Sequence, residues 1–300
     1  MYCKDVEIME KILYDLTNPQ KSIWVTEQFY QNSSVNNIVG HMKIAKNADL
    51  DALEKALNLF IMNNDAFKLK VVKENNEPKQ YFSDFIYQKF ERIDIENELQ
   101  LDEFEKKFSQ RNMCTENSLL FNIVLLRLPN SGGMFIINAH HLISDAWTMS
   151  LLLNEVYTNY LNIIEKKEIE PIHNPSYLDF IKSNTDYLNS EKFQKDKEYW
   201  DENFKDFPSI VTFKETSPSI SSNRKVFNFS ESLIEKIEDF CTQNKVSVYI
   251  FLLAIYGVYF RNIFNTNRFV IGNPVLNRSG FKEKHTVRYV CIYYALFIQY

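Results

Sequence analysis

The sequence predicts an α/β protein of two lobes, with strands and helices mixed along the whole chain. Apolar residues alternate in some segments and recur with a helical period in others. The chain has 300 residues, of which 45% are hydrophobic and 24% charged, so each lobe can bury its own core. Pro171 and Pro175 interrupt the pattern, and we therefore expect an N-terminal lobe over residues 1–170 and a C-terminal lobe over 171–300.

In the first lobe we expect helices, a strand and two hairpins. Asn18 followed by Pro19 marks a helix start, because proline is favoured in the first helical turn. Asp49 can cap a second helix. Turn-forming residues between paired apolar runs mark the hairpins. The predicted elements are a strand over 38–44, a helix over 50–60, a hairpin of 68–72 with 79–82, a helix over 102–113 and a hairpin of 119–128 with 134–138.

After residue 141 the apolar period becomes helical, and the rest of the chain again mixes helices with strands. Ser230 and Ser247 are suitable N-caps for two helices. The charged run Glu191 to Glu202 is expected to be a solvated helix face. The predicted elements are a helix over 147–164, an amphipathic stretch over 177–204, a strand over 225–229, helices over 233–240 and 250–264, and a strand over 268–275.

Composition excludes several classes of protein. The formal net charge of −5 gives no electrostatic support to a nucleic-acid partner. The longest apolar run, Tyr249 to Phe260, is too short to cross a bilayer, and the N-terminus lacks the apolar core of a signal peptide. We therefore expect a cytoplasmic protein without a membrane, nucleic acid or metal. The cysteines, none at metal-ligand or disulfide-framework spacing, are Cys3, Cys114, Cys241 and Cys291.

The segment from Asn138 to Trp147 carries the candidate chemistry, because it contains His140, His141 and Asp145. Neighbouring strand residues point to opposite faces, so one histidine can face a cleft while the other packs inside. Asp145 falls where a helix begins, and its carboxylate can accept backbone N–H groups or bind a cation. A histidine placed there can take a proton from an attacking amine. Taken by itself, a pair of histidines at a strand end is more often structural than catalytic.

Four ordered segments make this chain similar to the condensation domains of nonribosomal peptide synthetases, within the chloramphenicol-acetyltransferase-like superfamily. His140 to Ala146 resembles the family's His-His-x-x-x-Asp-Gly motif. The resemblance covers Leu13 to Val287. The other three segments are Leu16 to Trp24, which resembles the opening motif, Pro175 to Phe180 with Tyr199-Trp200, which resembles the segment after the first lobe, and Ile271 to Arg278, which resembles a Gly-x-Pro-x-x-x-Arg loop.

The resemblance implies a two-lobed sandwich with a cleft between the lobes, and it implies roles for the motif residues. His141 would be the catalytic group that accepts a proton from the acceptor amine or positions the amine. His140 would be mainly structural within the same catalytic motif. Asp145 would orient the loop through an ion pair, for which Arg278 is the matching partner. A simple helix cap at Asp145 and an exposed loop arginine at Arg278 are the alternatives.

The implied reaction joins an acyl or peptidyl donor to an aminoacyl acceptor through an amide bond. Donor and acceptor peptidyl carrier proteins of the synthetase modules would deliver both substrates on their 4′-phosphopantetheine arms. No cofactor would be bound directly. Two alternatives remain open, a free-standing acyltransferase of the same superfamily and a non-catalytic, frameshifted remnant.

Two departures from the family pattern stand out. Ala146 replaces the glycine of the histidine motif, and a methyl group there would resist a left-handed backbone. Asn63, Asn64 and Asp65 stand where the family has Arg-His-Glu on an early helix. The loss of basic groups puts a local ion pair in question.

The motif comparison also predicts that the resemblance ends at Val287, where the family continues with Gly-x-Phe-Val. Residues 288–292 can be encoded AGG TAT GTT TGT ATA, and skipping the first base gives Gly-Met-Phe-Val. We therefore expect a shifted reading frame near Val287, a longer natural domain and an incomplete second lobe. Arg288 to Tyr300 is aromatic, β-branched and almost uncharged, so it can form a strand and is an aggregation hazard.

Overall fold

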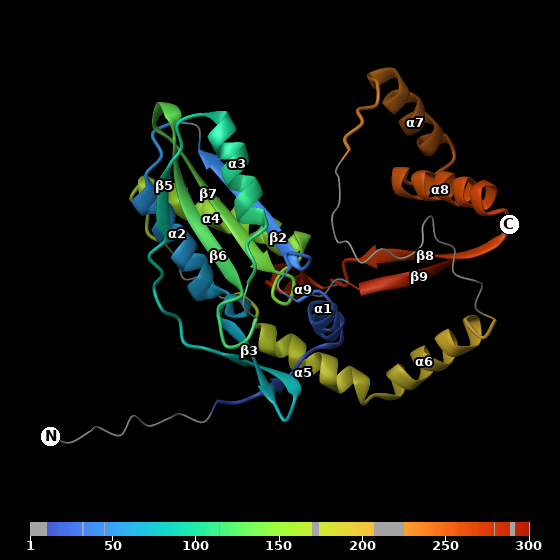
Figure 1. Cartoon of the computed structure of the whole chain (residues 1–300). Coiled ribbons are helices and arrows are strands. Elements are labelled where there is room, and N and C mark those ends of the chain that lie inside the picture. Colours follow the sequence, from blue (N-terminus) through green and yellow to red (C-terminus); the bar gives the residue numbers. More distant parts are fainter. Residues whose placement is uncertain are drawn as a thin grey trace. The chain divides into compact units, whose positions relative to one another are not determined.

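The computed structural model describes residues 11–31, 33–44, 46–113, 115–169, 174–206, 225–278, 280–288 and 292–299 (Figure 1). The chain forms two compact units. The first contains residues 1–195 and 276–292, and the second contains 196–275 and 293–300. The lobe boundary predicted at residue 170 falls just outside the described residues and stays a prediction.

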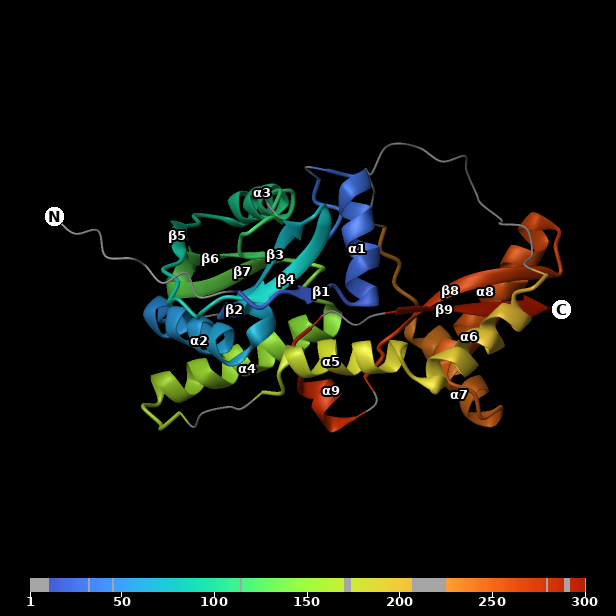
Figure 2. The same ribbon diagram turned by 90° about the horizontal axis from the view of Figure 1, so that it is seen from below.

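The first unit is built on a four-stranded sheet with helices on both faces. Strand β5 runs parallel to β6, and the other neighbouring pairs are antiparallel. Helices α2 and α4 cover one face and α3 covers the other (Figure 2). In sheet order the strands are β2 (Asn37–Ile44), β7 (Gly132–His140), β6 (Phe121–Leu128) and β5 (Glu91–Asp94), and the helices are α2 (Leu50–Asn63), α3 (Glu98–Ser109) and α4 (Ala146–Ile164).

Strand β7 is buried along its whole length, because both faces of the sheet are covered. Phe135, Ile137 and Ala139 pack in the core under α2 and α4. Met134 and Ile136, at the alternate positions, pack in the core with α3 residues. The turn η2 (Pro129–Ser131) joins β6 to β7, which confirms the predicted hairpin. A strand that is apolar on both faces fixes its own register, and so it fixes the histidines at its end.

Smaller elements surround this sheet. Strands β1, β4 and β3 form a second sheet in that order, and the β3–β4 pair confirms the other predicted hairpin. Their bounds are β1 (Tyr14–Asp15), β3 (Leu69–Glu74) and β4 (Glu77–Phe82), and the remaining elements of the first unit are α1 (Asn18–Phe29), η1 (Asp65–Lys68), α5 (Tyr177–Leu188) and α9 (Phe281–His285).

Two helix starts differ from the prediction. The N-cap of α1 is Thr17 rather than Asn18, because the Gln20 side chain accepts a hydrogen bond from the Thr17 backbone N–H at 2.9 Å and closes a capping box. Helix α3 begins four residues before the predicted Asp102, because Asn97 accepts a hydrogen bond from the Gln100 N–H at 3.0 Å and caps it. Side-chain caps thus decide both starts.

Among its described residues, the second unit contains two complete helices, part of a third and a two-stranded sheet. The predicted caps are the N-cap residues of both helices, and Ser247 also accepts a hydrogen bond from the Ile250 N–H at 3.2 Å. Strand β9 pairs with β8. The elements are α7 (Glu231–Gln243), α8 (Val248–Phe264), β8 (Arg268–Val275) and β9 (Ile292–Gln299), and α6 (Glu191–Asn203), whose residues are all at least partly exposed, lies across the boundary with the first unit.

The predicted strand over residues 225–229 was wrong, since these residues form no strand in the structure. Phe227 is 80% exposed. Alternating apolar residues become a strand only where a neighbouring strand accepts their hydrogen bonds. The segment has no such neighbour among the residues that the structure describes.

Helix α8 exposes an apolar surface. Ile255, Tyr256 and Val258 are each about half exposed, and the only buried residue of the helix is Gly257. No single helix among the described residues is long and apolar enough to cross a membrane. Helices α7 and α8 meet that criterion only as a pair, which is bent by 101° at the break between them.

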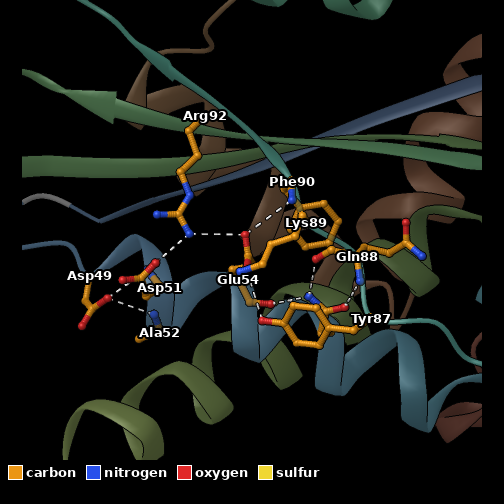
Figure 3. A network of polar contacts seen from close by, with 10 residues as sticks. Asp49, Asp51, Ala52, Glu54, Tyr87, Gln88, Lys89, Phe90 and Arg92 are labelled. Atoms are coloured by element: carbon orange, nitrogen blue, oxygen red, sulfur yellow. Dashed lines mark hydrogen bonds and ion pairs between the residues drawn. The ribbon is translucent and has the colours of Figure 1, made fainter.

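A buried carboxylate ties the segment before β5 to helix α2 (Figure 3). The Glu54 side chain is 3% exposed and binds Lys89 at 2.9 Å and Arg92 at 3.3 Å. The Tyr87 hydroxyl and the Phe90 N–H also donate to it. Burial acts to raise the pKa of Glu54, but the hydrogen bonds from Lys89 and Arg92 outweigh it, so the pKa lies below its ordinary value. Ionised Glu54 therefore stabilises the fold.

We expect Glu54→Gln to lower the free energy of unfolding at pH 7 by about 1–3 kcal/mol, because it removes hydrogen bonds between charged groups. The difference from wild type should be complete above the unfolded pKa of about 4.3 and shrink as pH falls through the lower folded pKa. Urea unfolding at several pH values measures it. The control is Asp51→Asn, because exposed Asp51 shares Arg92 and, screened by solvent, should contribute much less to stability than Glu54. Equal losses in both variants would contradict this role of the buried Glu54 carboxylate.

We expect the exposed face of α8 to bind the dye ANS and to promote self-association of the 300-residue chain. Replacing both Ile255 and Val258 by lysine should lower the dye binding and the self-association, with unchanged far-UV circular dichroism. Dye fluorescence and light scattering measure the change. Gln194→Lys adds the same type of charge to the polar helix α6 and should change neither reading. A lysine pair without effect would show that this face does not drive association.

Candidate active site

The two histidines end the central strand β7 and lie in different surroundings. His140 is buried, and its ring Nε2 lies 3.3 Å from Oε2 of Glu27 on α1. The His140 Nδ1 accepts a hydrogen bond from the Leu142 N–H at 3.1 Å. The His141 N–H donates to the Asn36 carbonyl at 2.8 Å. The backbone is therefore held on both sides of His141.

The ring of His141 is oriented by the loop that follows it. Its Nδ1 lies 3.0 Å from the carbonyl oxygen of Ser144. Because a carbonyl oxygen can only accept, Nδ1 carries the proton, and Nε2 is the basic nitrogen of the neutral ring. Burial lowers the pKa of His141, although the Ser144 hydrogen bond acts against it. At neutral pH the ring is therefore neutral and can accept a proton at Nε2.

Asp145 is both a helix cap and one half of a buried ion pair. Its Oδ1 accepts a hydrogen bond from the Thr148 N–H at 2.8 Å, which caps α4. Both carboxylate oxygens bind Nη2 of Arg278, at 3.2 and 3.0 Å. The Arg278 side chain is fully buried, and that of Asp145 is 6% exposed. The structure thus brings together the two residues predicted to pair, and the cap that was their alternative explanation is present as well.

Arg278 also fastens the segment that follows it. Its Nη1 donates to the Thr286 carbonyl at 2.6 Å, and its Nη2 donates to the Arg288 carbonyl at 2.9 Å. Thr148 on α4 exchanges hydrogen bonds with the backbone of Arg288. The Trp147 indole N–H donates to the Lys284 carbonyl at 2.7 Å. Residues 284–288 are therefore fixed against the first turn of α4, next to the histidine loop.

Ala146 fits its position without backbone strain. It is the first residue of α4, and its φ is not positive. A left-handed backbone, which would have favoured the family's glycine, is not required here. The extra methyl group therefore leaves the capped helix start intact.

The residues that replace the family's Arg-His-Glu segment form their own polar contacts. Asn63 and Asn64 donate to the Glu155 carboxylate, each at 3.3 Å, and Asn174 donates to it at 2.9 Å. Burial raises the pKa of Glu155, and these amide hydrogen bonds offset only part of that effect. Asp65 accepts hydrogen bonds from the N–H of Tyr177 at the start of α5. The amide groups of Asn63, Asn64 and Asn174 are thus the hydrogen-bond donors to the Glu155 carboxylate.

Sequence reasoning missed the contribution of α1 to the site. Gln20 Nε2 donates to the Leu142 carbonyl at 3.0 Å and to Gln80 at 2.9 Å. Glu27 and Asn36 contact the two histidines from the other side of the loop. Gln20 and Glu27 are two helical turns apart and therefore lie on one face of α1. Polar residues on a helix face that is buried need hydrogen-bond partners, and this signal could have pointed to the site.

Among the residues that the structure describes, no group of three or more histidine, cysteine or acidic side chains is arranged to hold a metal ion. Cys241 is buried with a free thiol. Cys3, Cys114 and Cys291 lie outside the described residues.

Curated relatives resemble this chain along most of its length. Surfactin synthase subunit 1 of Bacillus subtilis (strain 168) is 31% identical over 286 residues, which are 92% of this chain and 8% of that protein. Bacitracin synthase 3 of Bacillus licheniformis is 24% identical over 292 residues, which are 96% of this chain and 4% of that protein. The chain therefore spans only a small part of the length of these relatives.

Solved structures share the fold. The first condensation domain of the calcium-dependent antibiotic synthetase superposes with a TM-score of 0.84 at 14% identity, over 96% of this chain and 70% of that one. The starter condensation domain of rhizomide synthetase gives a TM-score of 0.83 at 18% identity, over 96% of this chain and 66% of that one. This chain therefore spans about two thirds of the length of these structures.

Residues 10–298 match the family model described as "Condensation domain". The match continues past Val287, so the prediction that the resemblance ends there was wrong. All of strand β9 except its last residue lies within the matched range, and the strand pairs with β8. The family model, the relatives and the shared fold agree that this chain belongs to the condensation domain family.

Proposed function

We propose that this domain forms an amide bond between a carrier-bound acyl or peptidyl donor and an aminoacyl acceptor in nonribosomal peptide synthesis. The observation that carries the proposal is His141, a neutral histidine whose Nδ1 is held by the Ser144 carbonyl and whose Nε2 is therefore basic. The four ordered motifs and the family membership support it.

In the proposed reaction, Nε2 of His141 accepts a proton from the acceptor amine as the amine nitrogen attacks the donor thioester carbon. The C–N bond forms, the C–S bond breaks, and the proton passes to the departing thiolate. A base is useful in this role only when it is deprotonated at the working pH and within hydrogen-bonding reach of the amine. The lowered pKa of His141 meets the first requirement.

The ion pair has a positioning role in this proposal. Asp145 holds the first turn of α4, and Arg278 joins that turn to the segment ending at Arg288. Ser144, whose carbonyl fixes the His141 tautomer, immediately precedes Asp145. The pair therefore stabilises the loop geometry on which the basic nitrogen depends, and it takes no part in proton transfer.

Donor and acceptor peptidyl carrier proteins of neighbouring modules are the proposed partners, and their 4′-phosphopantetheine arms supply both thioesters in the cytoplasm. Starter domains of rhizomide synthetase were crystallised with C8-CoA and with Leu-SNAC. A domain of the same fold thus takes these small-molecule ligands, which supports a site for acyl and aminoacyl groups in this chain. Product formed without carrier proteins would favour the free-standing acyltransferase instead.

We expect His141→Ala, in a synthetase module that carries this domain, to lower the rate of amide formation by about 10²–10⁴-fold, because general base help is lost. Mass spectrometry of carrier-bound product at a series of times measures the rate. The matched control is His41→Ala, since His41 is exposed and pairs on the surface with Glu105. Wild-type rates in both variants would refute the assignment of His141, whereas a failing wild-type domain would favour the non-catalytic alternative.

We expect Asp145→Ala and Arg278→Ala each to cost about 3–5 kcal/mol of stability, because each leaves an uncompensated buried charge. The double variant should cost less than the sum of the two, and urea unfolding of all four proteins gives the coupling energy. The Lys79–Asp15 pair, whose aspartate is 70% exposed, is a matched control cycle in which solvent screening should leave a much smaller coupling. Additive losses at Asp145 and Arg278 would contradict the ion pair.

A further inference from the structure

Glu27 is a largely buried carboxylate that connects helix α1 to the end of β7. Only 8% of the residue is exposed. Its Oε2 accepts a hydrogen bond from Nδ2 of Asn36 at 2.7 Å and lies 3.3 Å from Nε2 of His140. One carboxylate oxygen thus contacts the side chains of two residues from different segments.

The hydrogen bonds of His140 fix the direction of its contact with Glu27. Because the Leu142 N–H donates to Nδ1 of His140, that nitrogen is the acceptor and Nε2 carries the proton. The Nε2–H group therefore donates to Glu27. Burial acts to raise the pKa of Glu27, but the hydrogen bonds from His140 and Asn36 outweigh it and lower the pKa, so the group is a carboxylate.

The two residues that Glu27 binds both hold the backbone of His141. Asn36 accepts the His141 N–H at its carbonyl, at 2.8 Å. His140 precedes His141 in the chain, and its own N–H donates to the Leu120 carbonyl at 2.9 Å within the sheet. A shift of either partner would therefore move the His141 backbone. The ring hydrogen bonds give His140 and His141 opposite tautomers. The Leu120 and Asn36 carbonyls hold the backbone that carries the two rings.

We propose that Glu27 is a positioning residue for His141, acting through His140 and Asn36. Oε2 of Glu27 contacts both the His140 ring and the Asn36 side chain. By holding these two residues, Glu27 sets the position of the basic Nε2 of His141. The inference rests on the proposed function of His141 as the base. Glu27 itself touches no reacting atom in this scheme, so it is not a catalytic residue.

A purely structural carboxylate would anchor α1 without affecting the His141 ring, and nuclear magnetic resonance separates the two roles. The chain is labelled with ¹⁵N-histidine, and two-bond ¹H–¹⁵N spectra report the tautomer of each of its five histidines. Single substitutions assign the signals. Wild type should show the Nε2–H form at His140 and the Nδ1–H form at His141. This measurement needs no turnover.

In Glu27→Leu we expect the His140 ring proton to exchange with water at least about tenfold faster, because its buried acceptor is gone. The His141 ring should at the same time become a mixture of tautomers. Glu27→Gln keeps an oxygen that can accept both N–H groups and should restore both signals. Glu27→Asp keeps the charge but withdraws the oxygen, and it should perturb His141 even if the leucine variant fails to fold.

The matched control is Gln28→Leu, since Gln28 is the exposed neighbour on α1 and should leave both rings unchanged. In an active module, Glu27→Leu should lower kcat by about 10–10²-fold with nearly constant KM for both substrates, as expected for a misplaced base. An unchanged His141 ring in both Glu27→Leu and Glu27→Asp would overturn the proposal. A wild-type module without turnover would refute the proposed function, and the ring spectra would still test Glu27.

Discussion

The carboxylate of Asp145 is the interaction on which the site depends. It caps α4 and binds Arg278 at the same time, so one buried group fixes a helix start and a segment more than a hundred residues away in sequence. Removing either charge would leave its partner buried and uncompensated, which is costly in a low-dielectric interior. The helix cap and the ion pair are therefore stable only together. They also fix the geometry of the loop that carries Ser144.

Strand β7 supplies the second constraint. Its residues pack alternately into the two cores on the faces of the sheet, so a slip by one residue would move every side chain into the other core, where different neighbours surround it. His140 and His141 come immediately at its end, where one ring turns inward to Glu27 and the other is held by Ser144. Neighbouring residues of the same type thus acquire different tautomers, and different proposed roles, from their hydrogen-bond partners alone.

The first unit contains every residue of this site that the structure describes, including Arg278 and the segment that returns after the second unit. That return matters physically, because residues 276–288 bring the guanidinium and two carbonyl acceptors to the start of α4. The second unit has a different character, with an apolar helix α8 that is largely exposed. Solved members of the fold are longer than this chain, which spans 70% of the first of them.

The sequence by itself determined the helices and strands with strong periodicity, the two hairpins and the residues of the histidine motif. These features depend on local turn chemistry and on the alternation of apolar residues, which are written in short segments. Local patterns were insufficient at residues 225–229, where a strand required a partner, and at the start of α3, where Asn97 provided a cap that the apolar pattern did not reveal.

Only the tertiary structure decided how the motif residues are held. The motif suggested that Asp145 and Arg278 pair, but their burial and the shared role of Asp145 as a helix cap depend on the packing of distant segments. The contacts of Glu27 and Asn36 with the histidine loop have no signature in local sequence, because one joins side chains and the other joins backbone groups that are about a hundred residues apart. The tautomers of the two histidines follow from partners nearby in the chain, Ser144 and Leu142, but the fold alone decides which distant groups hold the two rings in place.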